Sequence, residues 1–397
     1  MTPSDVVITG VGLRIPGGRD MTSLMDLYRS GIAATKALSG PLSAWAGGTV
    51  EDSEIDTADT KQLDRCSILA VRAARDAVAM AGLEAPEALR EAGVYVGCGG
   101  GGLITTEQAT RDLFERNEAK GPTLLKTMTN APAAQISMSL GCHGPSLTYA
   151  MACSSSAHAI GEAVLAIRSG RCDLIIAGGT EAPMTLSLHR AWAALRLLSP
   201  GPDGLCRPFC YERGGLLLAE GSVFYVLESR RSAEARGAKP MAVLRGYGAR
   251  SDASHITAPN EKGQAATLAE ALKMSGLSAT DIGHISAHGT ATLAGDISET
   301  KAIRAVLGKH ADDVPITASK SFHGHLLGAA GGVSLLASLL AVTTGLIVPT
   351  VNFGTLDPEL DLDYVPNLAR QGPPVAASLC NAFGFGGSNA SLILTAA

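Results

Sequence analysis

The chain has 397 residues, of which 46% are hydrophobic and 17% charged, and its formal net charge at pH 7 is −5. This length is enough to bury a large core and to form two domains or two fused halves. The acidic balance argues against broad nucleic-acid binding, although a local basic patch could still dock an acidic partner.

Eight cysteines are too few for a disulfide framework in a chain of this length, and no C-x2-C pair occurs. We therefore expect reduced thiols, a cytoplasmic location and no structural metal. The N-terminal letters MTPSDVVITGVG show no basic region followed by an apolar stretch, so no signal peptide is expected. Residues 331–348 are uncharged and long enough to raise the question of a membrane span. Their glycines, serines and threonines favour a buried helix followed by a strand.

Short runs rich in valine and isoleucine alternate along the chain with longer stretches of helical pattern. The runs predict strands at residues 6–9, 94–97, 147–151, 174–177, 223–227, 284–287, 316–318 and 392–395. Helices are predicted at residues 68–81, 154–169, 265–275, 297–307 and 327–340. Because the strand runs lack polar alternation, the sheets should be covered on both faces, which predicts a layered α/β architecture.

The polar stretch 229–240 is the best candidate for a link between an N-terminal and a C-terminal half. Each half contains a strand, a short polar turn and a helix rich in alanine and glycine, at residues 146–169 and 316–340. The similarity lies in the pattern rather than in the letters, and it suggests an internal duplication.

Cys153 lies where a strand-like run, 146–152, meets a helix-like run, 154–169. Free N–H groups in the first turn of a helix, together with the helix dipole, favour the thiolate, which is the nucleophilic form. The small residues around it would let a substrate approach closely. Most free cysteines are buried and structural, so a catalytic role needs partners elsewhere in the chain.

His288 follows a predicted strand in the letters ISAHGT, and the ends of strands are where α/β proteins place their sites. Thr290 and Thr292 could orient its ring. The alternative is a hydrogen-bonded core histidine.

Lys320 follows the apolar run 315–318. Because lysine is rarely buried without a partner, Asp296 and Glu299, three residues apart at a predicted helix start, are candidate counter-ions. The alternative is a surface ion pair. His325 is expected at the start of the next helix, where N–H groups oppose protonation and keep the ring neutral. Its neighbour His323 is expected to face solvent.

The stretch NAFGFGGSN at residues 381–389 combines glycines with Phe383 and Phe385. Glycines let a backbone turn its N–H groups toward a reacting oxygen, which is how an oxyanion hole is built. The alternative is a structural turn. The letters GCGGGG at 97–102 match G-x-G-x-x-G only formally, because no acidic residue follows at the spacing of a dinucleotide site. G-x-S-x-G, P-loop and H-E-x-x-H motifs are absent from the sequence.

Together these segments resemble the β-ketoacyl synthases of the thiolase superfamily, of the Cys-His-His type that elongates acyl chains on acyl carrier protein. The resemblance covers essentially the whole chain. Its motifs are, in order, GPSLTYAMACSSSAHAIGEA, RPF, AHGTAT-L-x-GD-x-x-E, SKSxxGHLLGAAGG and NAFGFGGSNA. It implies a thiolase-like α/β fold with αβαβα layers and two similar halves, residues 1–236 and 237–397.

The resemblance also implies roles for individual residues. Cys153 would accept an acyl group as a thioester, while His288 and His325 would hold the malonyl thioester carbonyl and stabilise the enolate that decarboxylation forms. Lys320 would be structural and electrostatic, paired with Glu299. The N–H groups of Cys153 and Phe385 would form the oxyanion hole, and Phe385 would also be a gate over the thiol.

The implied activity is a decarboxylative condensation of the acyl group on Cys153 with malonyl-acyl carrier protein. It needs no metal or organic cofactor. The implied partners are an acyl carrier protein and a second ketosynthase chain, in a homodimer or a heterodimer with a chain-length-factor-like homologue. No nucleic acid or membrane is expected. A polyketide, polyene or related specialised pathway is favoured over primary fatty-acid elongation.

The chain departs from the fatty-acid elongating type at three places. After RPF, where that type has Asp-x-x-Arg-Asp-Gly-Phe, residues 210–216 read CYERGGL, so gating by Phe385 is expected to differ. Gly100 stands where a bulky aliphatic residue is usual, and it is expected to open the far end of the acyl pocket. The carrier-docking helix is less basic than usual, with Lys61 and Arg65 as candidates.

Two other classes share the fold. Thiolases use a second cysteine near the C-terminus, but Cys380 precedes NAFGFGG instead of lying in a thiolase-like glycine motif. Non-catalytic chain-length partners of ketosynthases lack the reactive cysteine, and Cys153 counts against that role.

Overall fold

One continuous ten-stranded sheet runs through the described chain, residues 5–55 and 62–397 of this computed structural model. The strand order is β10-β9-β13-β14-β8-β1-β7-β6-β4-β5. The N-terminal strands are β1 (Val6–Arg14), β4 (Gly93–Gly97), β5 (Ser146–Tyr149), β6 (Leu174–Glu181) and β7 (Gly221–Ser229). The C-terminal strands are β8 (Ala242–Ser251), β9 (Ile282–Ser286), β10 (Ile316–Thr317), β13 (Ala377–Gly384) and β14 (Ser388–Ala396).

Helices connect and cover these strands. In the N-terminal part they are α1 (Met21–Ser30), α2 (Arg65–Met80), α3 (Pro86–Leu89), α4 (Leu103–Arg116), α5 (Pro122–Thr127), α6 (Ala131–Leu140), α7 (Ser155–Arg168), α8 (Leu186–Ala194) and α9 (Arg230–Ala235). In the C-terminal part they are α10 (Glu261–Ser275), α11 (Leu293–Leu307), α12 (Lys320–His323) and α13 (Ala330–Thr344). Two short ribbons, β2 (Lys36–Ala37) with β3 (Ala46–Gly47) and β11 (Leu346–Ile347) with β12 (Arg370–Gln371), lie outside the main sheet.

The two halves of the sheet repeat one topology. β4 pairs in parallel with β5 and β6, and β9 pairs in parallel with β10 and β13. β6 and β13 then continue antiparallel into β7 and β14, which pair in turn with β1 and β8. The two halves meet where β1 pairs with β8 over three residues. The repeated pattern that the sequence suggested is therefore a repeated strand order, and the half boundary at 236/237 stays a prediction.

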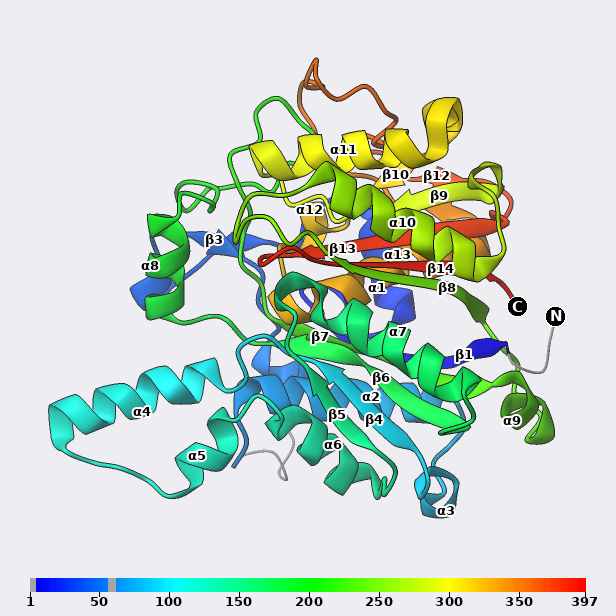
Figure 1. The fold of residues 1–397 in the computed structure, drawn as a ribbon. Coiled ribbons are helices and arrows are strands. Elements are labelled where there is room, and N and C mark those ends of the chain that lie inside the picture. Colours follow the sequence, from blue (N-terminus) through cyan, green and yellow to red (C-terminus); the bar gives the residue numbers. More distant parts are fainter. Residues whose placement is uncertain (1–4, 56–61) are drawn as a thin grey trace.

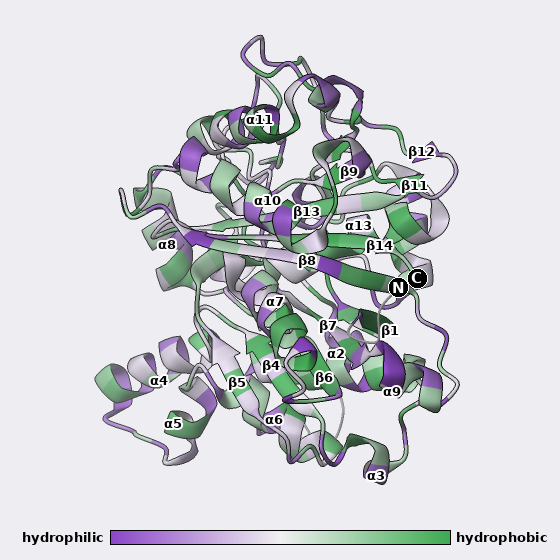
Figure 2. Ribbon diagram, turned by 45° about the vertical axis from the view of Figure 1, so that its right-hand side comes forward, coloured by the Kyte–Doolittle hydropathy of each residue, from purple (hydrophilic) through white to green (hydrophobic). Residues whose placement is uncertain are grey.

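The elements form five layers (Figure 1). α10 and α11 cover the C-terminal strands from outside, α7 and α13 lie between the two sets of strands, and α2 with α6 covers the N-terminal strands. β1, β6 and β7 are buried along their whole length, as expected for strands covered on both faces. Their hydrophobic character contrasts with hydrophilic α9 at the rim (Figure 2).

The stretch 229–240, predicted to link the two halves, runs between β7 and β8 and is partly helical. It forms α9, whose Ala233 packs in a buried cluster with Val7 and Val243. This contact fastens the crossover between the halves to the strands where they meet.

One helical stretch among the described residues, Leu327–Thr344, is long and apolar enough to cross a membrane, but 83% of it is buried inside the protein. It comprises a 3-10 turn, Leu327–Ala329, and helix α13, and β11 follows it. The sequence-based interpretation as a core helix and a strand is confirmed, although the regular helix begins later than predicted.

Two strands of the ten-stranded sheet escaped sequence-based prediction, β8 and β13. β8 reads AVLRGYGARS and β13 reads ASLCNAFG, so neither offers an uninterrupted run of β-branched residues. Both are paired with strands on each side, and that pairing, which is not local, holds them extended.

Gly97 ends β4 directly against the helix that follows Cys153. A Cβ there would overlap the backbone of Ser155 and Ser156. We expect Gly97→Ala to lower the free energy of unfolding by about 1–3 kcal/mol, as overpacking does. Urea unfolding measures this, and Gly372→Ala is the matched control, because a Cβ at Gly372 meets nothing within 4 Å. Equal stability of the two variants would contradict the tight approach.

Candidate active site

Cys153 lies in a 3-10 turn, Ala152–Ser154, between β5 and α7, as predicted. Ala152 has φ of 48°, a left-handed conformation that is strained for a residue with a Cβ. The two following serines hold this turn. Ser154 Oγ donates to the Met151 carbonyl at 2.8 Å, and Ser155 Oγ donates to the Ala152 carbonyl at 2.7 Å. The serine run thus holds the backbone on both sides of Cys153 as well as keeping its surroundings small.

The free protein does not favour the thiolate of Cys153. Burial raises the pKa of this thiol to about 11, and Glu181 adds to that effect. The Lys320 ammonium and hydrogen bonds from the backbone N–H groups of Phe385 and of Cys153 itself act in the opposite direction. The local N–H groups therefore act in the predicted direction, but desolvation outweighs them and the net pKa is raised.

Glu299 shapes the backbone that carries His288. From α11, its carboxylate accepts the N–H groups of His288 and Gly289, each at 2.8 Å, and the side-chain amide of Asn381 at 3.1 Å. Gly289 has φ of 41°, which this turn requires. Burial raises the pKa of Glu299, whereas those hydrogen bonds and Lys320 lower it.

Lys320 is bound to His288 rather than to Glu299. Its Nζ donates to the His288 carbonyl at 2.5 Å and lies 3.5 Å from His288 Nδ1. No ion pair joins it to Glu299 among the described residues, so the predicted pairing is wrong as a contact. Burial lowers the pKa of Lys320, and Glu299 raises it from a longer distance.

The two histidine rings present equivalent groups to one cavity. His325 Nδ1 accepts the Leu327 N–H at 3.2 Å, which leaves the ring proton on Nε2, and this Nε2 has no hydrogen-bond partner in the described chain. The ammonium beside Nδ1 of His288 likewise favours a proton on Nε2. Burial and Lys320 hold the pKa of both rings well below the usual value of 6.5. The rings are 5.6 Å apart and nearly perpendicular, at 84°.

A cavity of about 510 Å³ joins these groups. Cys153, His288 and His325 line it together with Phe383 and Phe385. The predicted triad and glycine-rich segment, which are distant in the sequence, therefore meet in one space.

Phe385 lies in a tight hairpin between β13 and β14. The expected loop 381–389 is narrower than predicted, because residues up to Gly384 and from Ser388 onward belong to the strands. The Phe385 ring stacks on Trp192 of α8, with centroids 5.4 Å apart and an angle of 23°. Phe383 meets His288 edge-on at 5.8 Å. Trp192 also lines the cavity, and nothing in its local sequence had marked it.

Thr290 and Thr292 line the cavity but do not hold the His288 ring. Their hydroxyls bond each other at 2.9 Å. The Asp296 carboxylate accepts hydrogen bonds from the N–H groups of Phe209 at 2.7 Å and Thr290 at 3.2 Å. Burial raises the pKa of Asp296 to about 7. These residues support the loop rather than contact the imidazole.

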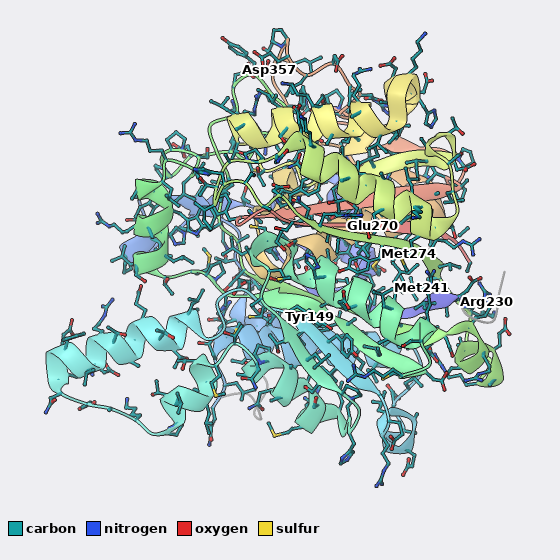
Figure 3. All side chains as sticks on the ribbon, in the orientation of Figure 1. Tyr149, Arg230, Met241, Glu270, Met274 and Asp357 are labelled. Carbon is teal, nitrogen blue, oxygen red and sulfur yellow. The ribbon has the colours of Figure 1, made fainter. Side chains whose placement is uncertain are left out.

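The unusual segment 210–216 is anchored by contacts of its own. Cys210 Sγ donates to Glu212 at 2.6 Å, and Glu212 accepts the Thr355 N–H at 3.0 Å. Arg213 is buried, lines the cavity and pairs with Asp357 at 2.5 Å. Asp357, labelled at the top of Figure 3, lies on the loop between β11 and β12. The segment is thus fastened to that loop despite its missing acidic residues.

Of the three residues predicted from the sequence to form the acyl pocket or to dock a carrier, the two that the structure describes do not line the cavity. Gly100 donates its N–H to Glu181 at 3.0 Å and does not line the cavity of the described chain. Arg65 is held by Glu220 at 2.7 Å and Asp52 at 2.6 Å, so its guanidinium is not free to dock a carrier. Lys61 lies outside the described residues.

Two further residues are structural. His323 is buried, not exposed, and its ring bonds the Pro16 carbonyl at 2.8 Å and the Tyr28 hydroxyl at 3.0 Å. Cys380 is buried in β13 with its sulfur toward the Gly331 carbonyl, away from the cavity lining, which removes the main support for a second thiolase cysteine.

The raised pKa of Cys153 predicts the pH dependence of its reactivity. Only the thiolate alkylates, and with a pKa of about 11 the thiolate fraction rises about tenfold per pH unit throughout the range 7 to 9.5. Iodoacetamide labelling followed by peptide mass spectrometry measures the rate at Cys153. A plateau below pH 9 would contradict the raised pKa, and Cys153→Ser controls for labelling elsewhere.

Comparison with known proteins accounts for this arrangement. Residues 3–233 match the family model "Beta-ketoacyl synthase, N-terminal domain", and residues 241–354 match "Beta-ketoacyl synthase, C-terminal domain". Nodulation protein E of Rhizobium meliloti (strain 1021) is 41% identical over 98% of both chains. The 3-oxoacyl-[acyl-carrier-protein] synthase 2 of Staphylococcus aureus (strain COL) is 36% identical over 98% of this chain and 97% of that one.

Solved structures agree with the fold. The ishigamide ketosynthase/chain length factor superposes with a TM-score of 0.92 at 31% identity over 99% of both chains. A ketosynthase of a type II polyketide synthase, in complex with its acyl-carrier protein and bound to the hexaketide, gives 0.91 at 27% identity over the whole of both chains. The predicted thiolase-like α/β fold is confirmed, and the chain belongs to the β-ketoacyl synthase family of acyltransferases.

Proposed function

We propose that Cys153 accepts an acyl group as a thioester, and that this group condenses with malonyl-acyl carrier protein with loss of carbon dioxide. One observation carries the proposal. The backbone N–H groups of Phe385 and Cys153 lower the pKa of the Cys153 thiol, and two neutral imidazoles line the same cavity with Nε2–H as the available donor. These are the donors that two successive oxyanions need.

In the first step, the Cys153 sulfur attacks the thioester carbonyl of the acyl-carrier protein. The developing oxyanion is held by the N–H groups of Cys153 and Phe385. The carbon–sulfur bond to the carrier breaks, and the Cys153 proton ends on the released carrier thiol. Because the donors are already in position, a thiol of high pKa reacts without a permanently charged base.

In the second step, the malonyl thioester loses its carboxylate as carbon dioxide. The electron pair of the broken bond forms an enolate, and its oxygen is held by Nε2–H of His288 and His325. The enolate carbon attacks the acyl carbonyl on Cys153, and the sulfur leaves as a thiolate, which takes a proton from solvent and restores the thiol. Neutral donors suit this step, since the lowered pKa of both rings keeps them as hydrogen-bond donors at neutral pH.

The surface supports a second ketosynthase chain as partner. β5 ends the sheet order, so one of its edges lacks a neighbouring strand within the described part of the chain. Beside it α4 and α5 project from the body (Figure 1) and expose Phe114 at 83%, Leu124 at 68% and Leu125 at 67%. An open strand edge beside an apolar patch favours burial against another chain. Both a homodimer and a heterodimer with a chain-length-factor-like homologue fit this surface.

We also propose that the condensation belongs to a polyketide, polyene or related specialised pathway, with primary fatty-acid elongation as the alternative. It is supported by the identity to a nodulation protein and by the structural likeness to an ishigamide and a type II polyketide ketosynthase. The segment 210–216, where the chain departs from the elongating type, agrees with it. A cytoplasmic location remains our prediction.

Removing the thiol tests the nucleophile. We expect Cys153→Ala to abolish condensation of acyl- and malonyl-acyl carrier protein and to leave no acyl adduct in mass spectra of the intact protein. Cys380→Ala is the matched control, because Cys380 is equally free and buried but lies outside the cavity. Condensation by Cys153→Ala at the unmodified rate would overturn the assignment.

Removing the imidazoles separates the two steps. We expect His288→Ala and His325→Ala to slow malonyl decarboxylation by about 100-fold or more, since each removes one donor to the enolate oxygen. Acyl transfer to Cys153 should fall less. Carbon dioxide release and the acyl-enzyme mass measure the two rates in parallel, and a larger loss in acyl transfer would refute the division of roles.

A further inference from the structure

A chain of side-chain hydrogen bonds runs beneath the cavity and does not reach it. His158 Nδ1 lies 2.9 Å from the Tyr247 hydroxyl, and its Nε2 lies 3.2 Å from Ser388 Oγ. Tyr247 continues to Glu162 at 3.3 Å, and Ser388 Oγ lies 3.4 Å from Ser154 Oγ, whose own proton goes to the Met151 carbonyl. The His158 side chain is buried, and it does not line the cavity.

The chain has one consistent direction. A carboxylate only accepts, so the Tyr247 hydroxyl donates to Glu162, His158 Nδ1–H donates to Tyr247, and the Ser388 hydroxyl donates to His158 Nε2. The imidazole is neutral in this arrangement. Burial agrees with that state, since it lowers the pKa of His158 to about 4.

Two neighbouring members of this chain, His158 and Ser388, lie on the two segments that supply N–H donors to Cys153. His158 is on α7, five positions after Cys153, and Ser154 directly follows the nucleophile. Ser388 opens β14, three positions after Phe385. The backbones are already close, because a Cβ on Gly384 would lie 2.7 Å from the Met151 carbonyl oxygen and 3.2 Å from Ser154 Oγ.

Pairing of Ser388 with Ser251 of β8 and a backbone hydrogen bond from Gly386 to the Ile256 carbonyl hold the hairpin to the C-terminal half. The hydrogen bond from Ser388 to His158 adds a side-chain tie to the other half, because it joins the first residue of β14 to the helix that follows Cys153. Tyr247 in turn holds the ring from β8, where Gly161 packs against its aromatic face. The position of the Phe385 N–H relative to the sulfur therefore depends on the ring of His158.

We propose that His158 is a positioning residue of the acyl-transfer step, which holds the Phe385 N–H in register with that of Cys153. The proposal rests on the function proposed above. If the proposal is right, removing the His158 ring slows reactions of Cys153 that form an oxyanion. Reactions of the same sulfur that form no oxyanion keep their rate.

Two reactions of Cys153 separate these cases. Acylation by hexanoyl-N-acetylcysteamine passes through a tetrahedral oxyanion, whereas alkylation by iodoacetamide does not. We expect His158→Phe, which keeps the ring shape without nitrogens, to lower the ratio of acylation to alkylation rate about 10- to 100-fold, since loss of one oxyanion donor costs about 100- to 1000-fold. Ser388→Ala, a smaller change, should lower the same ratio. His158→Gln, which retains a polar group toward Ser388, should restore part of it.

Matched controls and opposing outcomes complete the test. His284→Phe removes a histidine that is also buried and bonds two side chains, Ser378 and Thr317, but does not reach the hairpin, and its ratio should stay unchanged. An unchanged ratio in both His158→Phe and Ser388→Ala, or an equal loss of alkylation, would overturn the proposal. If the unmodified protein formed no hexanoyl adduct at Cys153, the proposed function itself would fail, which is a distinguishable result.

Fluorescence gives an independent readout of the hairpin. Trp192 stacks on Phe385, and the chain has only one other tryptophan, Trp45. In a Trp45→Phe background, emission reports Trp192 alone. We expect His158→Phe to shift this emission and His284→Phe to leave it unchanged, and the same emission in all three proteins would contradict movement of the hairpin.

Discussion

A buried ammonium at Lys320 connects the reactive groups of the site. It donates a hydrogen bond to the His288 carbonyl at 2.5 Å and lies 3.5 Å from Nδ1 of the His288 ring. Its charge helps to keep both imidazoles neutral, and it opposes the desolvation that raises the pKa of Cys153. A single cation therefore lowers the pKa of the thiol that the proposed mechanism deprotonates and of the two imidazoles that it keeps neutral. Burial makes this influence strong, because a charge in a low-dielectric interior is poorly screened.

The duplicated topology explains why these groups meet. The turn with Cys153 follows β5, and the segment with Lys320 and His325 follows β10, which holds the same place in the second half of the sheet. α7 and α13 lie side by side between the two sets of strands, so both turns open toward one cavity. The hairpin of Phe385 closes the cavity from the C-terminal half, and the network around His158 ties it to the N-terminal half.

Local features of the site were predictable because they depend on neighbouring residues. The strand-to-helix turn at Cys153 and the loop after β9 at His288 follow from patterns a few residues long. Contacts between distant segments were not. Lys320 donates to the backbone carbonyl of His288 instead of pairing with the Glu299 carboxylate. Trp192 stacks on Phe385, and Arg65 forms an ion pair with Glu220. Each of these contacts joins residues that are distant in the sequence, so the pattern of neighbouring residues does not predict it.

By itself, the sequence determined the alternation of strands and helices and the family, and it predicted the reactive residues, because hydrophobic periodicity and short motifs are local properties. Only the tertiary structure decided their states. The depth of burial sets the pKa of Cys153, Lys320 and the histidines, and burial is produced by elements that are distant in the chain. The same holds for the single continuous sheet, since the pairing of β1 with β8 joins the halves across more than two hundred residues of sequence.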